Sequence, residues 1–597
     1  MIYNPLNTFY KSIIGAVPEN TLIKFRVKGN FNSVTFVLKK DGEQDRFYEM
    51  NKFNGYFEIE LSFSIGLYFY CFKLDNGSYV ALGEDYSSII CENKNYYQLS
   101  VYSKNFTTPQ WLLGGIIYQI FPDRFNISRH KTIETDRFLH KNLSDTPYFL
   151  PNAKGKIENV DFFGGNICGI IEKLPYISSL GVNVIYLNPI FKANSNHRYD
   201  TGDYMQIDPL LGDINDFKTL IDKASEFGIK IVLDGVFNHT GDDSLYFNKY
   251  GKYDSVGAYQ SKNSPYYNWF NFKNYPNDYE SWWGITILPS TNKNNEDFIN
   301  FITGENGVIE YYTSLGIGGW RLDVVDELPG DFVKKIRSAV KKINPQAVVI
   351  GEVWEDASNK ISYGERREYF LGNELDSVMN YPLKNAIIDF VLSGNEKMLS
   401  LVIKEQIDHY PKKCLDVLMN MLSTHDTVRI ISALSGININ GLTKLEQSKI
   451  KLTDEQYLKA VKKVKIASVL QYMLYGVPSV YYGDEIGMQG FLDPLNRKFF
   501  DSKNIDEDLL FWYIKLGSIR RQFSCFKDGE LTEIYCKNSV FVFKRYNDES
   551  EVLIGVNASD SDVELTFSGS LNNLLTNKRA KEKITIGEGE AVILANL

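Results

Sequence analysis

Three carboxylic acids stand where buried strands are expected to end. Asp323 ends the segment GWRLD, Glu352 ends VIGE, and Asp426 lies in STHD. Taken singly, each would more often be a solvated charge or an ion-pair member. Taken together, a chemical site explains them better, because charged side chains are not needed for packing at strand ends. Glycoside hydrolysis requires a pair of carboxyl groups around the bond that is cut.

Asp323 and Glu352 form the best candidate pair. On neighbouring parallel strands they can lie about 5 Å apart, the separation of a retaining glycosidase. One carboxyl group would attack the anomeric carbon, and the other would protonate the departing oxygen. Arg321 lies two residues before Asp323, hence on the same strand face, where its charge favours an ionised nucleophile.

Parallel strands would bring these residues together, and the apolar pattern between residues 112 and 482 predicts such strands. Continuous apolar runs are typical of strands buried on both faces, and here they alternate with helical patterns at 169–180, 213–227, 297–314 and 329–343. The runs lie at 116–121, 182–187, 230–237, 318–324, 347–353, 375–379, 415–422 and 477–482. This alternation predicts an α/β fold, a (β/α)8 TIM barrel with its site at the carboxyl ends of the strands.

Both ends of the chain show the alternating pattern of exposed sheets, for example at 22–28, 33–38, 56–61, 540–544 and 551–556. After the third barrel strand lie nearly sixty residues rich in aromatic side chains, which is too long for a structureless loop. The predicted domains are an N-terminal β-sandwich at 1–108, the barrel at 109–238 and 297–515, an inserted small domain at 239–296, and a C-terminal β-sandwich at 516–597.

Four strand-end stretches resemble, in order and position, the signature regions of glycoside hydrolase family 13, the α-amylase family. They read LDGVFNH from residue 233, GWRLD from 319, IGEV from 350 and STHDTVR from 423. The resemblance implies that Asp323 is the nucleophile, Glu352 the acid/base, and Asp426 a third carboxylate that binds ring hydroxyls. It implies supporting roles around the cleaved sugar for Asp234, Asn238, His239, Arg321 and His425.

Further segments are similar to the neopullulanase, cyclomaltodextrinase and maltogenic amylase group of this family. They include YQIFPDRF from residue 118, SNHRYDT from 195, YGDEIGM from 482 and DPLNR from 493. The resemblance implies that Tyr199 stacks on the sugar and that Glu327 lies near the acceptor side. The complete set of substrate-binding residues expected from both levels of resemblance is Tyr199, His197, Asp200, Asp234, His239, Arg321, His425, Glu327, Asp493 and Arg497.

Composition limits the classes of binding partner and the cellular location that we expect for this protein. The net charge is −9, which argues against a nucleic-acid-binding protein, and no apolar run approaches the ~20 residues of a membrane helix. No basic start with a long apolar stretch marks a secretory signal, so the expected location is cytoplasmic. Aromatic residues make up 14% of the chain, and aromatic faces can stack on pyranose rings. The inserted segment supplies the candidates Tyr266, Tyr267, Trp269, Trp282 and Trp283.

No metal site is predicted, and no cofactor is expected to be required. The related group binds calcium through an Asn- and Asp-rich loop and the aspartate of a GGD segment. Here the loop reads NISRHKT from residue 126, and Asn166 replaces that aspartate. Calcium needs six to eight oxygen ligands, often carboxylates, so we expect its site to be lost or weak.

Three functions stay open at this point. The first is a retaining hydrolase of α-1,4 bonds in maltooligosaccharides, cyclodextrins, pullulan or starch, with α-1,6 cleavage and transglycosylation as additional activities. The second is an α-glucan transglycosylase on the same scaffold. The third and most distant is a non-catalytic α-glucan-binding protein, which would be expected to lack one of the three carboxylates. The group's N-terminal domain often mediates dimers, so the resemblance also raises a homodimer through residues 1–108.

Overall fold

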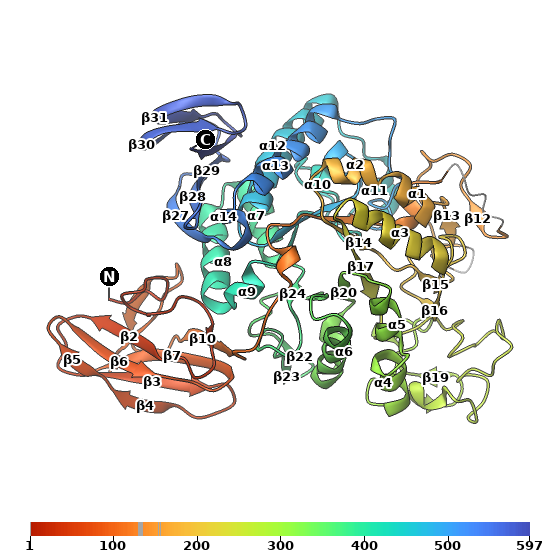
Figure 1. Ribbon diagram of the computed structural model, residues 1–597, viewed down its shortest axis with the longest axis horizontal. Helices are drawn as coiled ribbons and strands as arrows, with labels where there is room; N and C mark the ends of the chain where they lie inside the picture. Colours follow the sequence, from red (N-terminus) through yellow and green to blue (C-terminus); the bar gives the residue numbers. More distant parts are fainter. Residues whose placement is uncertain (1, 129–134, 153–154, 156, 597) are drawn as a thin grey trace.

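A closed barrel of eight parallel strands forms the centre of the computed structural model, which describes residues 2–128, 135–152, 155 and 157–596 (Figure 1). In spatial order the strands are β24 (Ser377–Val378), β21 (Val348–Gly351), β20 (Gly319–Leu322), β17 (Lys230–Gly235), β14 (Val184–Leu187), β11 (Ile117–Ile120), β26 (Val477–Tyr481) and β25 (Met419–Met421). Met379, directly after β24, pairs in parallel with Met419 of β25 and closes the ring. The predicted TIM barrel is confirmed.

The barrel interior changes from apolar to charged along its strands. Val232 and Asp234 share one face of β17, and Asp234 stands opposite Arg321 of β20. Val348 and Ile350 share the corresponding face of β21, and Glu352 is the next residue on it. The apolar members belong to one buried cluster at the amino ends of the strands. The inward face of these strands is therefore apolar at the amino end and bears charged residues at the carboxyl end.

The helices around the barrel follow the predicted order, with two differences. The helix expected at 169–180 is divided into α1 (Ile167–Glu172) and α2 (Leu174–Ser179), because Pro175 has no N–H to continue the first helix. The helix expected at 297–314 is divided into α4 (Glu296–Thr303) and α5 (Val308–Ser314) at the glycines of 304–307. The other helices are α3 (Ile214–Glu226), α6 (Gly330–Ile343), α7 (Tyr381–Ser393), α8 (Glu396–His409), α9 (Lys412–Leu415), α10 (Ile430–Ala433), α11 (Lys444–Lys449), α12 (Asp454–Met473), α13 (Glu507–Gln522) and α14 (Cys525–Asp528).

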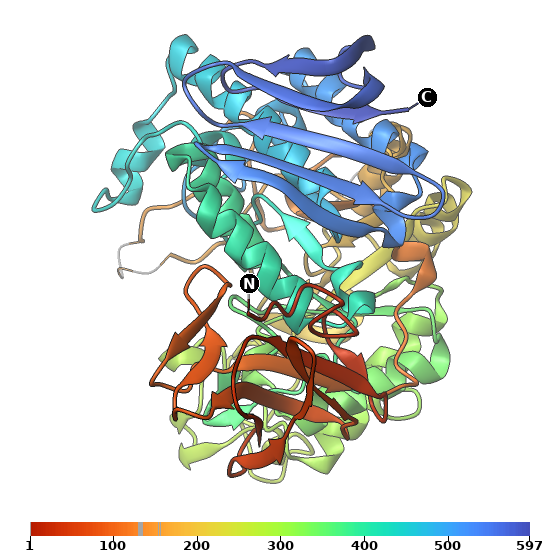
Figure 2. The ribbon, with the colours of Figure 1, turned by 90° about the vertical axis from the view of Figure 1, so that its left-hand side faces the viewer.

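Sheets flank the barrel at both ends of the chain. The N-terminal region packs β2 (Ile23–Lys28), β6 (Tyr56–Leu61) and β5 (Asn51–Phe53) onto a larger sheet of β1 (Val17–Pro18), β10 (Tyr97–Tyr102), β7 (Gly66–Leu74), β3 (Val34–Lys40) and β4 (Arg46–Glu49), which β8 (Tyr79–Leu82) and β9 (Ser88–Cys91) extend. Helix α8 lies between this region and the C-terminal sheet, in contact with β10 and β27 (Figure 2).

The C-terminal region is one sheet that folds over itself. Its order is β27 (Glu530–Lys537), β28 (Val540–Tyr546), β29 (Glu551–Asn557), β32 (Ala591–Ala595), β30 (Val563–Asn573) and β31 (Lys578–Ile586). Leu565 and Ile586 of the last two strands share an apolar cluster with Val540 and Val592. The pairing of β30 with β31 shifts register between Thr566 and Ser570, where the strand bends.

Two of the small hairpins lie in the segments that follow barrel strands β14 and β17. The first, β15 (Phe191–Ala193) and β16 (Thr201–Ile207), was not expected and carries residues 194–200 between its strands. The second, β18 (Phe272–Asn274) and β19 (Asp278–Tyr279), lies in the segment after β17. That segment returns to its starting point, since His239 pairs with Ser290. Within the described part of the chain, no helix is long and apolar enough to cross a bilayer.

Candidate active site

A cleft of about 1310 Å³ opens at the carboxyl ends of the barrel strands. Asp323 follows β20 and Glu352 follows β21, and both line the cleft together with Asp426. The other expected residues that line it are His197, Tyr199, Asp200, His239, Glu327, His425, Asp493 and Arg497. The structure therefore brings the three carboxylates predicted from separate stretches into one cavity.

Arg321 joins the carboxylates from below the cleft. Its Nη1 atom lies 2.8 Å from Oδ1 of Asp323 and 2.8 Å from Oδ1 of Asp234, and its Nη2 atom lies 2.8 Å from Oε2 of Glu352. Arg321 and Asp234 are almost fully buried and do not line the cleft. One planar guanidinium thus fixes the positions of three acidic side chains, a task that suits its rigid fork of donors.

The buried acids carry more negative charge than this one cation offsets. Burial raises the pKa of Asp323 well above its usual value, the nearby Glu352 and Asp234 raise it further, and Arg321 opposes them. Burial likewise raises the pKa of Asp234. Like charges sharing a dry site cannot all ionise at once, so the cluster as a whole retains a proton to higher pH than separate carboxyl groups would.

Backbone and indole donors orient Glu352. The Val324 N–H donates to its Oε2 at 2.9 Å, and the Trp354 indole N–H donates to its Oε1 at 3.2 Å. Trp354 is itself held flat against Tyr381, with ring centres 3.8 Å apart. Trp354 was not identified from the sequence, although its place two residues after Glu352, just beyond the end of β21, was a usable signal.

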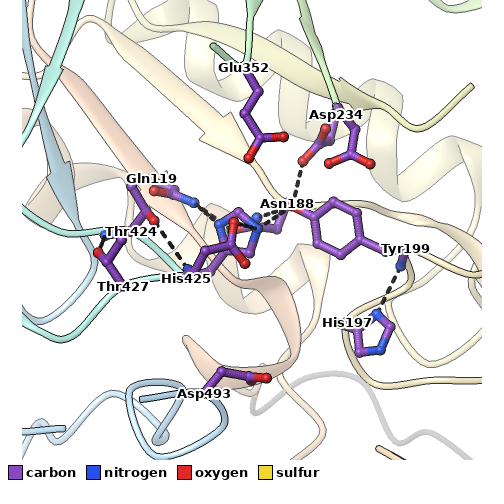
Figure 3. Close-up of polar contacts among 12 residues, drawn as sticks. Gln119, Asn188, His197, Tyr199, Asp234, Glu352, Thr424, His425, Thr427 and Asp493 are labelled. Atoms are coloured by element: carbon purple, nitrogen blue, oxygen red, sulfur yellow. Dashed lines mark hydrogen bonds and ion pairs between the residues drawn. The ribbon is translucent and has the colours of Figure 1, made fainter. Parts of the chain in front are cut away.

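Tyr199 lies at the centre of a hydrogen-bond network (Figure 3). Its hydroxyl donates to Asp234 at 2.8 Å and accepts from the Asn188 amide at 2.9 Å. It lies 2.5 Å from Nε2 of His425, and the planes of the two rings are nearly parallel. Donating once and accepting twice satisfies the hydroxyl completely, which locks the ring in place at the cleft wall.

Gln119 determines which nitrogen of His425 carries the proton. The Gln119 amide nitrogen lies 2.9 Å from Nδ1 of His425 and 3.0 Å from the Asn188 carbonyl oxygen. An amide N–H donates, so Nδ1 accepts and the ring proton sits on Nε2, facing Tyr199 and the cleft. Burial, with the Arg497 and Arg321 cations adding to it, holds the pKa of His425 well below its usual value, so the ring stays neutral. Sequence reasoning missed Gln119 and Asn188.

Asp426 is bound from one side by Arg497. Arg497 Nη2 lies 3.3 Å from Oδ1 of Asp426, and its Nη1 lies 2.7 Å from Oδ1 of Asp493. Burial raises the pKa of Asp426 to about 7, and Arg497 is the largest opposing influence. Asp493 and Arg497 therefore form a charged wall behind the third carboxylate.

His197 and Asp200 brace the loop that carries Tyr199. The Tyr199 N–H donates to Nδ1 of His197 at 3.1 Å, and the Ser195 N–H donates to Asp200 at 3.0 Å. Burial lowers the pKa of His197 well below its usual value, and nearby arginine cations lower it further. Burial raises the pKa of Asp200 to about 6. Both side chains reach the cleft, where they can hydrogen-bond to sugar hydroxyls.

The aromatic candidates of the inserted segment divide into two sets. Trp282 and Trp283 line the cleft, and Trp282 stacks on His239 with ring centres 5.2 Å apart. Trp269 packs inside against Phe298 and is not part of the cleft wall. Tyr266 and Tyr267 also lie outside that wall. Of these five candidates, the pair of tryptophans is therefore the one placed to meet a ligand.

The asparagines of the expected calcium loop serve a helix instead. Asn166 accepts the Gly169 N–H at 2.8 Å as the N-cap of α1, and Asn126 turns its amide nitrogen to the Gly169 carbonyl at 3.0 Å. Residues 129–132 of that loop lie outside the described residues. Among the residues that are described, no group of three or more His, Cys, Asp or Glu side chains could hold a metal ion. In the described part of this loop, Asn126 and Asn166 are therefore already hydrogen-bonded to the backbone of α1.

A (β/α)8 barrel with acids gathered around one guanidinium at its carboxyl end has the architecture of a carboxylate-based glycosidase. Residues 119–511 match the family model of the α-amylase catalytic domain, and the chain belongs to that family.

Three relatives give the family more detail. The chain is 35% identical to an amylopullulanase of Thermoanaerobacter thermohydrosulfuricus over 90% of its own length and 40% of the relative's. It is 33% identical to a cyclomaltodextrinase of Thermoanaerobacter pseudethanolicus, over 77% of this chain and 72% of that one. A solved cyclomaltodextrinase structure matches with a TM-score of 0.71 and 25% identity over 99% of both chains. The chain spans less than half the length of the amylopullulanases that it matches.

Proposed function

We propose that this protein is a retaining, endo-type α-glucan hydrolase that cleaves α-1,4-glucosidic bonds by double displacement. The observation that carries the proposal is the joint attachment of Asp323 and Glu352 to Arg321 at the wall of one cleft. Two carboxyl groups held by a single guanidinium suit the short separation, about 5 Å, that a retaining mechanism uses.

In the proposed reaction Asp323 attacks the anomeric carbon while Glu352 gives its proton to the departing glycosidic oxygen. The sugar is then bound to Asp323 as an ester. In the second step Glu352 removes a proton from water, the water oxygen bonds to the anomeric carbon, and the ester bond breaks. Tyr199 supports the sugar ring, and neutral His425 donates through Nε2 to the Tyr199 hydroxyl and so holds that ring in place. Asp426 accepts from ring hydroxyls.

An α-glucan transglycosylase remains the second candidate. It shares the first step and differs only in that a sugar hydroxyl, rather than water, intercepts the ester. Exposed Trp283, which donates to Glu327, favours it, because its ring provides an apolar surface on which an acceptor sugar can rest. The non-catalytic alternative is disfavoured because all three carboxylates are present and reach the cleft.

Maltooligosaccharides, cyclodextrins, pullulan and starch are the proposed substrates, and the names of the related proteins, amylopullulanase and cyclomaltodextrinase, support this choice. Incubation with cyclodextrin, pullulan and starch, followed by product chromatography, tests it. Panose from pullulan indicates α-1,4 cleavage, and maltotriose indicates α-1,6 cleavage. The absence of products from all three would contradict the proposal.

Asp323→Asn separates the mechanism from mere binding. We expect kcat to fall on the order of 10⁴-fold with substrate affinity retained, because the nucleophile is lost and the cleft shape is kept. Asp331→Asn, at an exposed acid on α6, is the matched control and should leave kcat unchanged. Full hydrolysis by Asp323→Asn would overturn the assignment of the nucleophile.

We further propose that activity needs no metal and that the protein forms a homodimer through its N-terminal region. The capping role of Asn166 supports the first point. Exposed Phe47 on the edge strand β4 and Ile90 on β9 support the second, since exposed apolar edges favour association. Unchanged activity after chelation tests the first proposal, and sedimentation of wild type against Phe47→Lys tests the second.

A further inference from the structure

The loop after β21 walls the cleft on the side of the acid. It begins beyond Glu352, and its residues Lys360, Ile361, Ser362 and Tyr363 all line the cavity. The acid exchanges its proton with the departing and the incoming oxygen, so the leaving group and any acceptor must occupy this side. The position of this loop therefore affects the binding of the acceptor and not the binding of the sugar that reacts.

A two-residue hairpin forms the tip of that loop. Strands β22 (Ile361–Ser362) and β23 (Glu365–Arg366) pair antiparallel, with Tyr363 and Gly364 between them. Tyr363 has a φ of 53° and Gly364 a φ of 80°, a turn in which a bulky side chain is strained. Such a conformation persists only where the surroundings hold it in place.

Glu327, in the short turn after β20, holds this tip. The Tyr363 hydroxyl donates to its Oε2 at 2.5 Å, and the Trp283 indole N–H donates to its Oε1 at 2.9 Å. Tyr363 and Trp283 are 70% and 76% exposed. Two large aromatic rings thus stand open to solvent at the cleft wall, bound to the two oxygens of one carboxylate.

The base of the hairpin is held by the N-terminal region. Arg366 donates to both oxygens of Asp41, through Nε at 2.9 Å and Nη2 at 3.2 Å. Arg366 also donates to the backbone carbonyl of Asn359, and the Asn359 amide donates to Gln98 at 2.8 Å. Asp41 lies directly after β3, and Gln98 lies on β10. Both residues are far in sequence from the barrel segment that they support.

We propose that Asp41 and Gln98 are positioning residues through which the N-terminal region determines the placement of the Tyr363 tip, and with it the affinity of the cleft for an acceptor sugar. The bidentate contact fixes the direction of Arg366, which a single hydrogen bond would not do. Arg366 pairs with Ile361 in the hairpin, only two positions from Tyr363, so a change at Asp41 reaches the tip through one rigid turn. This inference rests on the proposed hydrolase function.

Asp41→Ala tests the inference by steady-state kinetics with maltotetraose and by the share of transfer products at high maltotriose. We expect KM to rise and the ratio of transfer to hydrolysis to fall, each about threefold to fivefold, the effect of losing one partly exposed ion pair. The kcat for p-nitrophenyl α-maltoside should stay unchanged, because its leaving group does not extend to the tip.

Asp45→Ala is the matched control. Asp45 pairs with Lys94 inside the same region and does not contact the hairpin, so this variant weakens the region without moving the tip. The exchanged pair Asp41→Arg with Arg366→Asp should restore part of the lost acceptor affinity. Provided that the wild type hydrolyses its substrate, either of two results would overturn the inference. One is an unchanged KM and transfer ratio in Asp41→Ala, and the other is an equal change of both quantities in Asp45→Ala. Absence of hydrolysis by wild type would instead overturn the proposed function.

Discussion

Arg321 contacts Asp323 through Nη1 at 2.8 Å, and the same nitrogen lies 2.8 Å from Asp234. A second nitrogen of the same side chain binds Glu352. Arg321→Lys keeps the charge but loses the fork, so it cannot hold all three acids. We expect kcat to fall on the order of 10³-fold and the free energy of unfolding to fall by about 3 kcal/mol.

Arg337→Lys is the control for that experiment. Arg337 is nearly buried and pairs with Asp376 at 2.7 Å on the outer side of the barrel. It should lose comparable stability with kcat retained. If Arg321→Lys kept kcat within tenfold of wild type, the shared guanidinium would not be what organises the cluster.

His425 provides a second prediction, because its tautomer depends on Gln119. Gln119→Glu places an acceptor beside Nδ1, which moves the ring proton to Nδ1 and leaves Nε2 without a hydrogen to donate. We expect kcat/KM to fall about 10- to 100-fold, the usual cost of disturbing a residue that orients a site histidine. Nitrogen NMR of His425 reports the tautomer directly, and an unchanged spectrum would contradict the assignment. Gln119→Met, which removes the donor without adding charge, should show a smaller loss.

The carboxylates could be predicted from sequence because they end long apolar strands, and the strand pattern is local. The network that orients them could not. Gln119 and Asn188 are single polar residues within or just after buried strands, and nothing local shows that they meet at His425. Tyr363 and Glu327 are 36 residues apart, and their contact exists only because the hairpin after β21 packs beside the segment after β20.

The secondary structure, too, could be predicted from the sequence only in part. Barrel strands were found because each is a continuous buried run, whereas β15 was missed because it has only three residues and its pairing with β16 is irregular. Pro175 shows why the expected first helix was too long: periodicity continues through a proline, although the hydrogen-bond ladder does not. Tertiary pairing, rather than local propensity, decides such short elements.

A third prediction concerns the fall of kcat/KM at acid pH, which depends on Asp426 and on its neighbour Arg497. Asp426 accepts strong, charge-assisted hydrogen bonds from the sugar only when ionised, so kcat/KM should fall as pH falls through its pKa of about 7. The Arg497 cation lowers that pKa, and the neighbouring Asp493 raises it. Arg497→Leu should therefore move the acid limb to higher pH, and Asp493→Asn should move it to lower pH. Shifts in the same direction for both variants would exclude Asp426 as the group that titrates.

The last prediction concerns the attachment of the N-terminal region to the barrel. Lys11 pairs with Asp408 of α8 at 2.7 Å, both side chains are fully buried, and the Tyr86 hydroxyl also donates to Asp408 at 2.7 Å. Lys11→Met leaves a buried carboxylate without its cation and should lower the free energy of unfolding by about 3–5 kcal/mol. Lys11→Met combined with Asp408→Leu removes both charges and should recover most of the loss, since an apolar pair of similar size often replaces a buried ion pair without cost. Urea titration of the four proteins measures the coupling energy. A double variant whose loss equals the sum of the two single losses would show that Lys11 and Asp408 are not coupled, and would contradict the prediction.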